Sequence, residues 1–331
     1  MKPLSPTDQL FLWLEKRQQP MHVGGLQLFS FPDDAPDDYV AQLADRLRQY
    51  TKVTPPFNQR LDYRFGQPVW GEDEHLDLEH HFRFEALPTP GRVRELLSFV
   101  SAEHSHLMDR ERPLWEFHLI EGLGERQFAV YIKVHHALVD GVSAMRMVTQ
   151  MLCQDTGERD MPPIWAMPPR PEREKDDGGP SLWRSIGHLL GESGKQLGTV
   201  PTVARELLRT INNARKDPAY SSIFHAPRSI LNQKITGSRR FAAQSYDLSR
   251  IKAVCKIYGT TVNDVVMAMC ATALRSYLMN QDALPEKPLI AMVPVSLRKD
   301  DSSGGNQVGV ILASLHTDVT SPVTRLMQIH E

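Results

Sequence analysis

Cysteine is scarce in this sequence, and the few cysteines present are too far apart to form a recognisable pattern. Only three occur in 331 residues, at Cys153, Cys255 and Cys270. An odd and widely spaced set argues against a disulfide framework and against a cysteine-rich metal site. It fits a protein of the reducing cytoplasm.

Long hydrophobic runs and an excess of one charge are also lacking. No apolar stretch approaches the roughly 20 residues that span a bilayer, so we expect any membrane contact to be peripheral. The N-terminal residues are interrupted by prolines and acids too early for a signal peptide. A net charge of −2 argues against nucleic acid as a partner.

Helix and strand patterns are mixed in both halves of the chain, which predicts an α/β sandwich-like fold. Helical spacing occurs at 39–50, 92–108, 141–152, 249–259 and 261–279. Strand patterns occur at 22–31, 115–123, 126–134, 239–246, 289–297 and 306–319. A first helix is expected after Ser5, where Pro6 and Asp8 complete a capping-box pattern. Ser249 and Gly259 are expected to begin and end the helix that they flank.

A segment rich in proline, glycine and charge divides the chain at 156–181 and predicts a linker. We expect an N-terminal domain at 1–155, a basic helical connection at 182–238 and a C-terminal domain at 239–331. Within the connection, the stretch 181–216 has six Lys and Arg residues against two acids. This stretch is either a solvated helix face or a patch for anionic lipid or a nucleotide phosphate.

The most distinctive stretch is VHHALVDG at 134–141, where two histidines stand in succession before an Asp-Gly turn. In the preceding strand pattern, one face carries Phe128, Val130, Ile132 and Val134, and the other carries Ala129, Tyr131 and Lys133. If the strand runs into the motif, His135 and His136 point to opposite sides of the sheet. One imidazole then faces a cleft while the other is buried, so we expect the two rings to have different roles.

Three familiar kinds of site do not fit this part of the sequence. Zinc sites on helices use histidines at i and i+4, and no third ligand is obvious near the adjacent pair, so we expect no metal. The sequence GVSAM at 141–145 lacks the last glycine of a nucleophile elbow. The sequence GESGK at 191–195 has Leu189 where a phosphate loop needs its first glycine, and Gln196 where it needs Ser or Thr.

General base catalysis is the chemistry that the motif does support. An unperturbed imidazole has a pKa of about 6.5 and can take a proton from an alcohol that attacks an activated acyl group. Asp140 and Gly141 offer the sharp turn that would expose such a base, because glycine tolerates positive φ. Asp140 can hydrogen-bond locally or pair with a distant arginine, and it can cap the helix that follows while it also orients the loop.

The stretch HHALVDG resembles the HHxxxDG motif of the acyltransferase superfamily that includes chloramphenicol acetyltransferases and peptide-synthetase condensation domains. Further stretches are similar to the bacterial wax ester synthase/acyl-CoA:diacylglycerol acyltransferase family. They are PLSPTDQLFLWLE at the N-terminus, RPLWEFHLIEGL at 112–123, TVNDVVMA at 261–268, and VPVSLR with GNQVG near the end. The stretches follow the family's order across nearly the whole chain.

This resemblance implies a two-domain fold of the chloramphenicol-acetyltransferase type with a tunnel between the domains. It implies an O-acyltransferase that makes wax ester or triacylglycerol, with acyl-CoA and a long-chain alcohol or diacylglycerol as partners. Neither a metal nor a redox cofactor is implied. The expected location is the cytoplasm, with peripheral contact to the inner membrane or to lipid inclusions.

The resemblance also implies roles for residues of the motif. His136 would be the general base, and His135 and Asp140 would hold the loop, with Gly141 supporting the turn. Asp140 is expected to pair with Arg298 of the stretch VPVSLR.

Residues outside the motif receive expectations as well. Pro113, Leu114 and Trp115 would shape the substrate site, although a strand start with a core tryptophan explains them equally well. Asn263 is expected near the reacting atoms. Asp264 is expected to support the site, or simply to cap its helix three residues after Thr261.

Two other functions remain open from the sequence. A condensation-type enzyme would take its acyl group from a carrier protein. A non-catalytic lipid-surface protein would use the basic stretch 181–216 for binding. Members of the family continue beyond the final LMQIHE, so we also expect the C-terminal domain to be incomplete.

Overall fold

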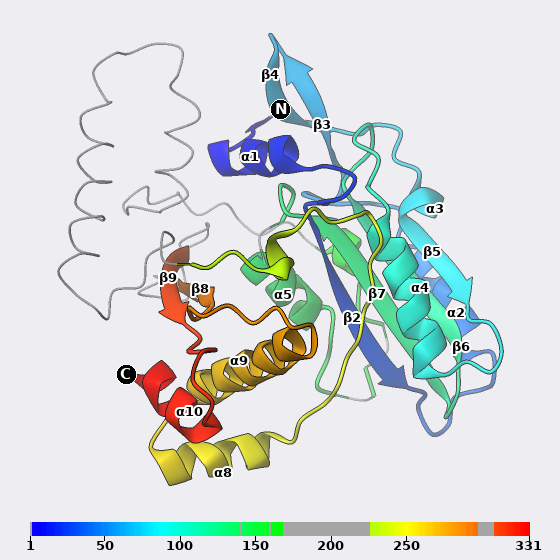
Figure 1. The fold of residues 1–331 in the computed structure, drawn as a ribbon. Helices are drawn as coiled ribbons and strands as arrows, with labels where there is room; N and C mark the ends of the chain where they lie inside the picture. The colour runs from blue at the N-terminus through cyan, green and yellow to red at the C-terminus, as the bar shows by residue number, and fades with distance from the viewer. Residues whose placement is uncertain (1, 140, 156, 159, 168–225, 297–307) are drawn as a thin grey trace. The chain divides into compact units, whose positions relative to one another are not determined.

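The computed structural model describes residues 2–139, 141–155, 157–158, 160–167, 226–296 and 308–331. The chain divides into two compact units, Met1–Glu174 with Ile235–Ala242 and Lys175–Lys234 with Ala243–Glu331. Most of the predicted linker and the whole basic stretch 181–216 lie outside the described residues. Figure 1 shows the described helices and strands of both units, each of which we describe by itself.

The first unit contains most of the described strands. Its elements are β1 (Lys2–Pro3), α1 (Pro6–Leu14), β2 (His22–Ser30), α2 (Tyr39–Arg48), β3 (Gln59–Arg64), β4 (Gln67–Glu72), α3 (Leu78–His81), β5 (Phe82–Ala86), α4 (Val93–Ser105), β6 (Trp115–Leu123), β7 (Gln127–His135), α5 (Gly141–Gln150) and the short 3-10 helix η1 (Ile164–Ala166). The capping box predicted at Ser5 is present, because Ser5 and Asp8 exchange hydrogen bonds across the first turn of α1.

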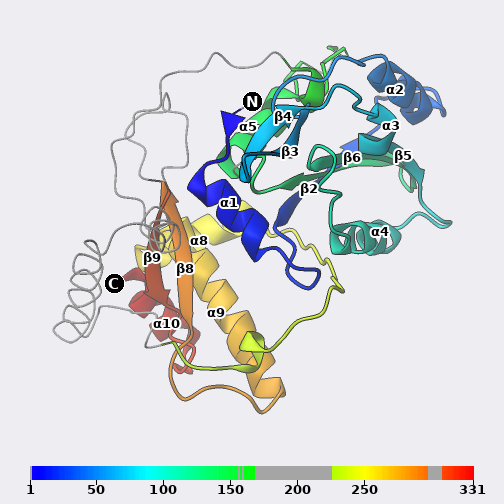
Figure 2. The same cartoon turned by 90° about the horizontal axis from the view of Figure 1, so that it is seen from above.

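A four-stranded sheet in the order β2-β7-β6-β5 forms the centre of this unit. β7 is antiparallel to both neighbours, and only β5 and β6 run parallel. Figure 2 shows the sheet with α4 on one side and α2 and α5 on the other. Both faces of β7 are therefore covered, as expected for a strand that is hydrophobic on two sides.

The two faces of β7 carry the residues that the alternation predicts. The core on the α2 side includes Phe128, Val130, Ile132 and Val134. The core on the α4 side includes Ala129 and Tyr131, and Lys133 is also fully buried there. The predicted division of the strand into two faces is thus confirmed.

A second, smaller sheet in the order β1-β4-β3 lies beside α1. Its residues share a hydrophobic cluster with α1 and with the chain near the histidine pair. The members of this cluster are Leu4, Leu12, Leu61, Trp70, Met108, Leu114 and Ala137. The cluster fixes α1 against the end of β7, which positions the site described below.

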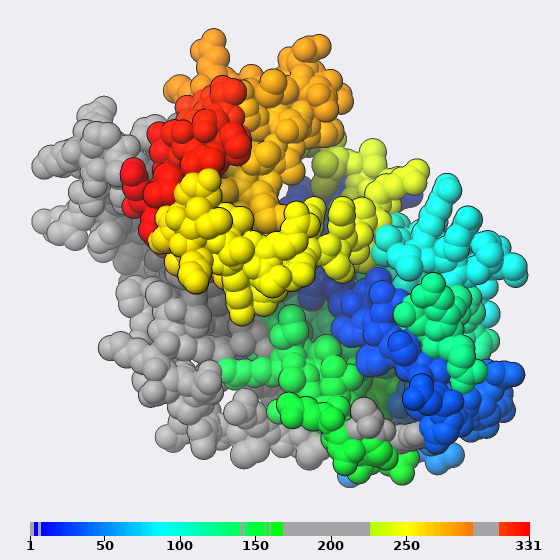
Figure 3. Space-filling model, turned by 90° about the horizontal axis from the view of Figure 1, so that it is seen from below, coloured from blue at the N-terminus to red at the C-terminus, as the bar shows by residue number. Residues whose placement is uncertain are grey.

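The second unit contains η3 (Ile230–Asn232), α8 (Leu248–Tyr258), α9 (Val262–Asn280), β8 (Ile290–Ser296), β9 (Val308–Ser314) and α10 (Pro322–His330). β8 and β9 form an antiparallel pair. Apolar residues of α8 and α10 pack against α9, and Figure 3 shows α8 in yellow beside α10 in red. Among the described helices, none is by itself long and apolar enough to cross a membrane, and α8 and α9 pass that test only as a pair bent by 103°.

Three local predictions are wrong. Residues 239–246 are not a strand, because they have no strand partner and their backbone bonds to side chains of α4 instead. The N-cap of α8 is Asp247, whose carboxylate accepts the N–H of Ser249 over 2.7 Å. The last predicted strand ends at Ser314 rather than at 319. The predicted helix end at Gly259 is confirmed by its left-handed conformation, with φ of 68°.

Candidate active site

The candidate site is built where the central strand β7 ends. The N–H of His135 donates to the carbonyl of Leu114 over 3.0 Å, and the N–H of His136 donates to the carbonyl of Met21 over 2.9 Å. The chain then turns sharply, because the N–H of Leu138 donates back to the carbonyl of His135 over 2.9 Å. Both histidines are therefore held by backbone hydrogen bonds to neighbouring segments.

His135 is buried, with 1% of its surface exposed. Its Nδ1 accepts the N–H of Ala137 over 3.0 Å, which leaves the proton of a neutral imidazole on Nε2. That Nε2 lies 3.3 Å from Oε1 of Glu15, at the end of α1. The hydrogen bond at Nδ1 thus fixes the tautomer of the neutral ring, and the Glu15 carboxylate lies within ion-pair distance of the other nitrogen.

Glu15 joins three parts of the chain, although its side chain is only 3% exposed. Its Oε1 accepts the N–H of Met21 over 3.1 Å, and its Oε2 accepts two N–H groups of Arg110 over 2.9 and 3.2 Å. Burial disfavours the charged carboxylate, but the contacts with His135, Met21 and Arg110 outweigh burial and lower the pKa of Glu15 to about 2. Glu15 is therefore an anion that braces the histidine turn.

His136 has different surroundings. It is half-buried, and its ring stacks on Phe11 of α1 with centroids 4.9 Å apart and an angle of 14° between the planes. One histidine of the pair is thus enclosed and braced, while the other is half-buried; that His136 faces a cleft stays a prediction. An accessible imidazole on a rigid turn can act as a general base.

A family model for the wax ester synthase/diacylglycerol acyltransferase catalytic domain matches residues 4–266. This chain belongs to that family. It is 48% identical to the O-acyltransferase WSD of Acinetobacter baylyi over 328 residues, which cover 98% of this chain and 70% of that relative.

Solved structures agree with this membership. The wax ester synthase/diacylglycerol acyltransferase from Marinobacter aquaeolei VT8 is 68% identical, with a TM-score of 0.76, and the match covers 99% of this chain and 70% of that one. The first condensation domain of the calcium-dependent antibiotic synthetase is 14% identical, with a TM-score of 0.52 over 99% of this chain and 72% of that one. The second match shows a shared fold alone. The predicted family and the mixed α/β fold are confirmed.

In this family member, Pro113, Leu114 and Trp115 lie in the core rather than on an open surface. The indole N–H of Trp115 donates to the carbonyl of Phe57 over 2.7 Å, and its ring stacks on His81. Leu114 supports the site through its carbonyl, which holds His135. The contact of these three residues with substrate stays a prediction.

Asn263 and Asp264 belong to the second unit, at the first turn of α9. Asp264 forms the predicted capping box with Thr261, and its carboxylate also lies 2.8 Å from Nδ1 of His330. Asn263 is exposed, with its amide nitrogen 3.7 Å from the sulfur of Met267. The place of Asn263 near the reacting atoms stays a prediction.

The remaining residues of the predicted site are Asp140, Gly141 and Arg298. Asp140 and Arg298 lie outside the described residues, and so does their expected pairing. Gly141 is the first residue of α5, and a side chain there would meet no atom within 4 Å in the described structure.

Sequence reasoning missed Glu15, Phe11 and Arg110. Glu15 is the last letter of the N-terminal stretch PLSPTDQLFLWLE, so an acid at the end of a family stretch was the available signal. Its partner His135 lies more than a hundred residues later, and no local pattern joins the two.

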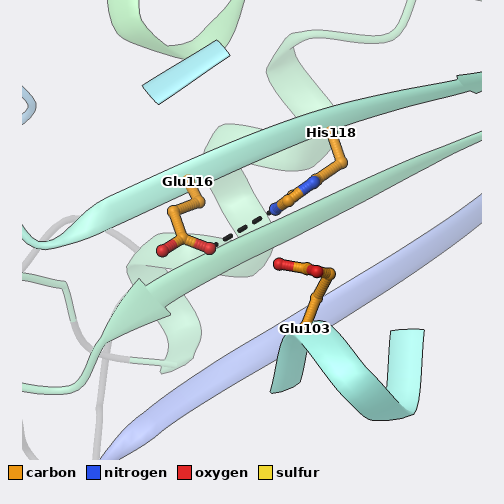
Figure 4. Close-up of side chains that lie close together, drawn as sticks. All are labelled: Glu103, Glu116 and His118. Atoms are coloured by element: carbon orange, nitrogen blue, oxygen red, sulfur yellow. Dashed lines mark hydrogen bonds and ion pairs between the residues drawn. The ribbon is translucent and has the colours of Figure 1, made fainter. Parts of the chain in front are cut away.

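A buried polar cluster lies on the α4 side of the same sheet. Figure 4 shows Glu103 from α4 and Glu116 and His118 from β6, whose ligand atoms all lie within 4.8 Å of one another. Lys133 of β7 already supplies a cation there, since its Nζ lies 3.3 Å from Glu116 and donates to the carbonyl of Glu103 over 2.9 Å. We therefore interpret the cluster as a buried ion pair that joins β6, β7 and α4.

The charges of this cluster depend on one another. Burial disfavours the carboxylate of Glu116, but His118 and Lys133 outweigh it and lower its pKa to about 2. Burial lowers the pKa of Lys133, and Glu116 opposes that change. The charge of Glu116 is thus stabilised by His118 and Lys133 together, and the charge of Lys133 is stabilised by Glu116.

The pKa of Glu15 makes a prediction for stability. Because its folded pKa is below the unfolded value of 4.5, its ionisation stabilises the fold above about pH 4.5, and this contribution is lost as the pH falls toward about 2. The contribution amounts to about 3 kcal/mol. We expect Glu15→Gln to reduce the acid dependence of the free energy of unfolding by this order, measured in urea between pH 5 and 2. An equally steep dependence in Glu15→Gln would contradict the assignment.

The cluster of Figure 4 makes a second prediction. Lys133→Met removes the lysine partner of the buried Glu116 carboxylate and leaves His118 beside it, so we expect the free energy of unfolding to fall by about 3 kcal/mol. The double variant Glu116→Gln/Lys133→Met should lose less than Lys133→Met alone, because neither charge remains. Urea unfolding of the two variants checks this, and equal losses would show that the charge pair is not the cause.

Proposed function

We propose that this member of the family takes its acyl group from acyl-CoA and transfers it to the hydroxyl of a long-chain alcohol or a diacylglycerol. Family membership supports the acyltransferase reaction. The observation that supports the mechanism is the unequal environment of the two adjacent imidazoles, with His135 braced by Glu15 and His136 stacked on Phe11.

In the proposed reaction, neutral His136 accepts the proton of the alcohol as the oxygen attacks the thioester carbonyl. A tetrahedral intermediate forms, and its carbonyl oxygen carries the negative charge. When the intermediate collapses, the carbon–sulfur bond breaks and the CoA thiolate takes the proton from His136. The ester and free CoA are the products, and no acyl-enzyme is formed.

The brace at His135 gives the neighbouring base its position. The backbone at 135–136 is tied to Leu114 and Met21, and the ring of His135 is tied to Glu15. A rotation of the turn that moved His136 would break these contacts. The energy that keeps the base in place is thus provided by the fold before any substrate binds.

His136→Ala should lower kcat for hexadecyl palmitate formation from palmitoyl-CoA and hexadecanol by about 10²–10⁴-fold, because the general base is removed. His75→Ala, at an exposed histidine of the same unit, is the matched control and should retain activity. Product ester is measured by thin-layer chromatography, and circular dichroism checks the fold. Full activity in folded His136→Ala would remove this residue from the mechanism.

The same assay separates the proposal from its rivals. A condensation-type enzyme needs a carrier-bound acyl group, so ester formation from free palmitoyl-CoA argues against it. A non-catalytic lipid-surface protein would form no ester, whether the wild-type protein or His136→Ala is assayed.

We further propose that the enzyme works in the cytoplasm, in peripheral contact with the inner membrane or lipid inclusions. Support comes from the hairpin of β3 and β4, labelled in Figure 1. Phe65 at its tip is 94% exposed and Tyr63 is 64% exposed. Phe65 and Gly66 have φ of 50° and 77°, values at which hairpins prefer Asn-Gly. An aromatic residue that is unfavourable for the turn and exposed to solvent suits insertion at a lipid interface.

Phe65→Asn tests this contact. We expect binding to lipid vesicles to fall by about tenfold, because the variant lacks the aromatic side chain that would be buried in the lipid interface. The melting temperature should stay the same or rise, since Asn favours the left-handed conformation. Ile257→Asn removes another exposed apolar side chain and is the control. An equal loss of vesicle binding in both variants would exclude the hairpin as the specific contact.

A further inference from the structure

A groove of about 1200 Å³ opens on the first unit between α4, the turn after α1 and the segment Ile235–Ala242. Figures 1 and 2 both show the segment passing beside α4. The charged residues that line the groove are four arginines: Arg17, Arg94, Arg239 and Arg240. No aspartate or glutamate is among its lining residues in the described part of the chain.

One wall of the groove is held to α4 by hydrogen bonds. Ser101 and Ser105 stand one turn apart on α4, and their hydroxyl oxygens accept the N–H groups of Phe241 and Arg239 over 2.8 and 3.1 Å. The wrong strand prediction at 239–246 has its explanation here, because these N–H groups are used on a helix surface and not in a sheet.

Arg239 closes the groove at its other side. Its guanidinium donates to the carbonyls of Thr236, Ser238 and Gln18 over 2.8, 3.0 and 2.8 Å. All three acceptors are neutral, so the contacts orient the guanidinium but do not cancel its charge. An oriented guanidinium suits bidentate binding of phosphate.

The acids nearest along α4 are engaged elsewhere. Glu95 pairs with Arg92 over 2.9 Å, and Glu103 lies 3.9 Å from Arg83 beside the buried cluster. The groove therefore keeps a positive field, which attracts a ligand with several negative charges.

We propose that this groove binds the phosphorylated nucleotide end of the acyl-CoA donor, an inference that rests on the proposed function. The phosphates pair with the guanidinium groups of Arg94, Arg239 and Arg240. Phe241 and Ile235 are 43% and 54% exposed, and they give the adenine base an apolar surface to stack on.

The groove is connected to the histidine turn through the residues after α1. Arg17 and Gln18 line the groove, and they stand in the turn between Glu15 and Met21. Glu15 contacts the ring of His135, and the carbonyl of Met21 holds the backbone of His136. Arg17 is two residues after Glu15 and Gln18 is three residues before Met21, so one short segment contributes both to the wall of the groove and to the brace.

The test is the double variant Arg94→Gln/Arg240→Gln, at two exposed arginines that no described hydrogen bond of the fold uses. We expect KM for palmitoyl-CoA to rise at least about tenfold, because charge-assisted contacts are lost. KM for hexadecanol and kcat should change little. Arg228→Gln/Arg250→Gln, at two exposed arginines outside the groove, is the matched control.

A second substrate separates phosphate binding from a general defect. Palmitoyl-pantetheine carries the same thioester without the nucleotide, so the double variant should use it as well as the wild type does. An unchanged KM for palmitoyl-CoA, or an equal loss with palmitoyl-pantetheine, would overturn the proposal.

A binding measurement keeps the result distinct from the proposed activity. Calorimetry with adenosine 3′,5′-bisphosphate should show binding to the wild-type protein and a loss of at least about tenfold in the double variant, even if no ester were formed. Vesicles of anionic phospholipid test the other source of phosphate. Loss of vesicle binding with unchanged nucleotide binding would assign the groove to lipid headgroups and overturn the proposal.

Discussion

The geometry of the histidine turn depends on the contacts of one buried carboxylate, that of Glu15. Removal of a carboxylate from water is unfavourable unless its oxygens are paired, and here they meet a guanidinium, a backbone N–H and an imidazole. Each partner comes from a different segment, so satisfying one charge brings α1, the chain before β6 and the end of β7 together. The site is thus a consequence of charge compensation inside the fold.

In the proposed mechanism, the two adjacent histidines have two different tasks, proton transfer at His136 and support of the turn at His135. A base that moves protons must be reachable by substrate, whereas a residue that fixes the backbone is best enclosed. β7 ends at His135 and the turn begins at His136, so the two rings have different neighbours, Glu15 for His135 and Phe11 for His136. Adjacent histidines of the HHxxxDG motif thus have different surroundings although they are consecutive in the sequence.

Local features of the fold could be predicted from the sequence because local physics determines them. The capping box at Ser5, the two faces of β7 and the helix end at Gly259 each depend on residues within a few positions. The prediction of His136 as the base came from resemblance, and the structure adds its stacking on Phe11.

Features that depend on distant partners could not be predicted in this way. Glu15 needs Arg110 and His135, and the burial of Lys133 needs Glu116 from a neighbouring strand. The segment 239–246 alternates like a strand, but the N–H groups of Arg239 and Phe241 donate to serine hydroxyls of α4 instead of to a neighbouring strand. Asp247 is the cap instead of Ser249 because α8 begins at Leu248, and the N–H of Ser249 is used to donate to the Asp247 carboxylate.

The position of α1 has a practical consequence. This nine-residue helix supplies Phe11 to the imidazole of His136, and the residue that follows it is Glu15, so its removal would take away a neighbour of each histidine while HHxxxDG stays intact. A substitution in α1 therefore alters the surroundings of both histidines from more than a hundred residues away in the sequence.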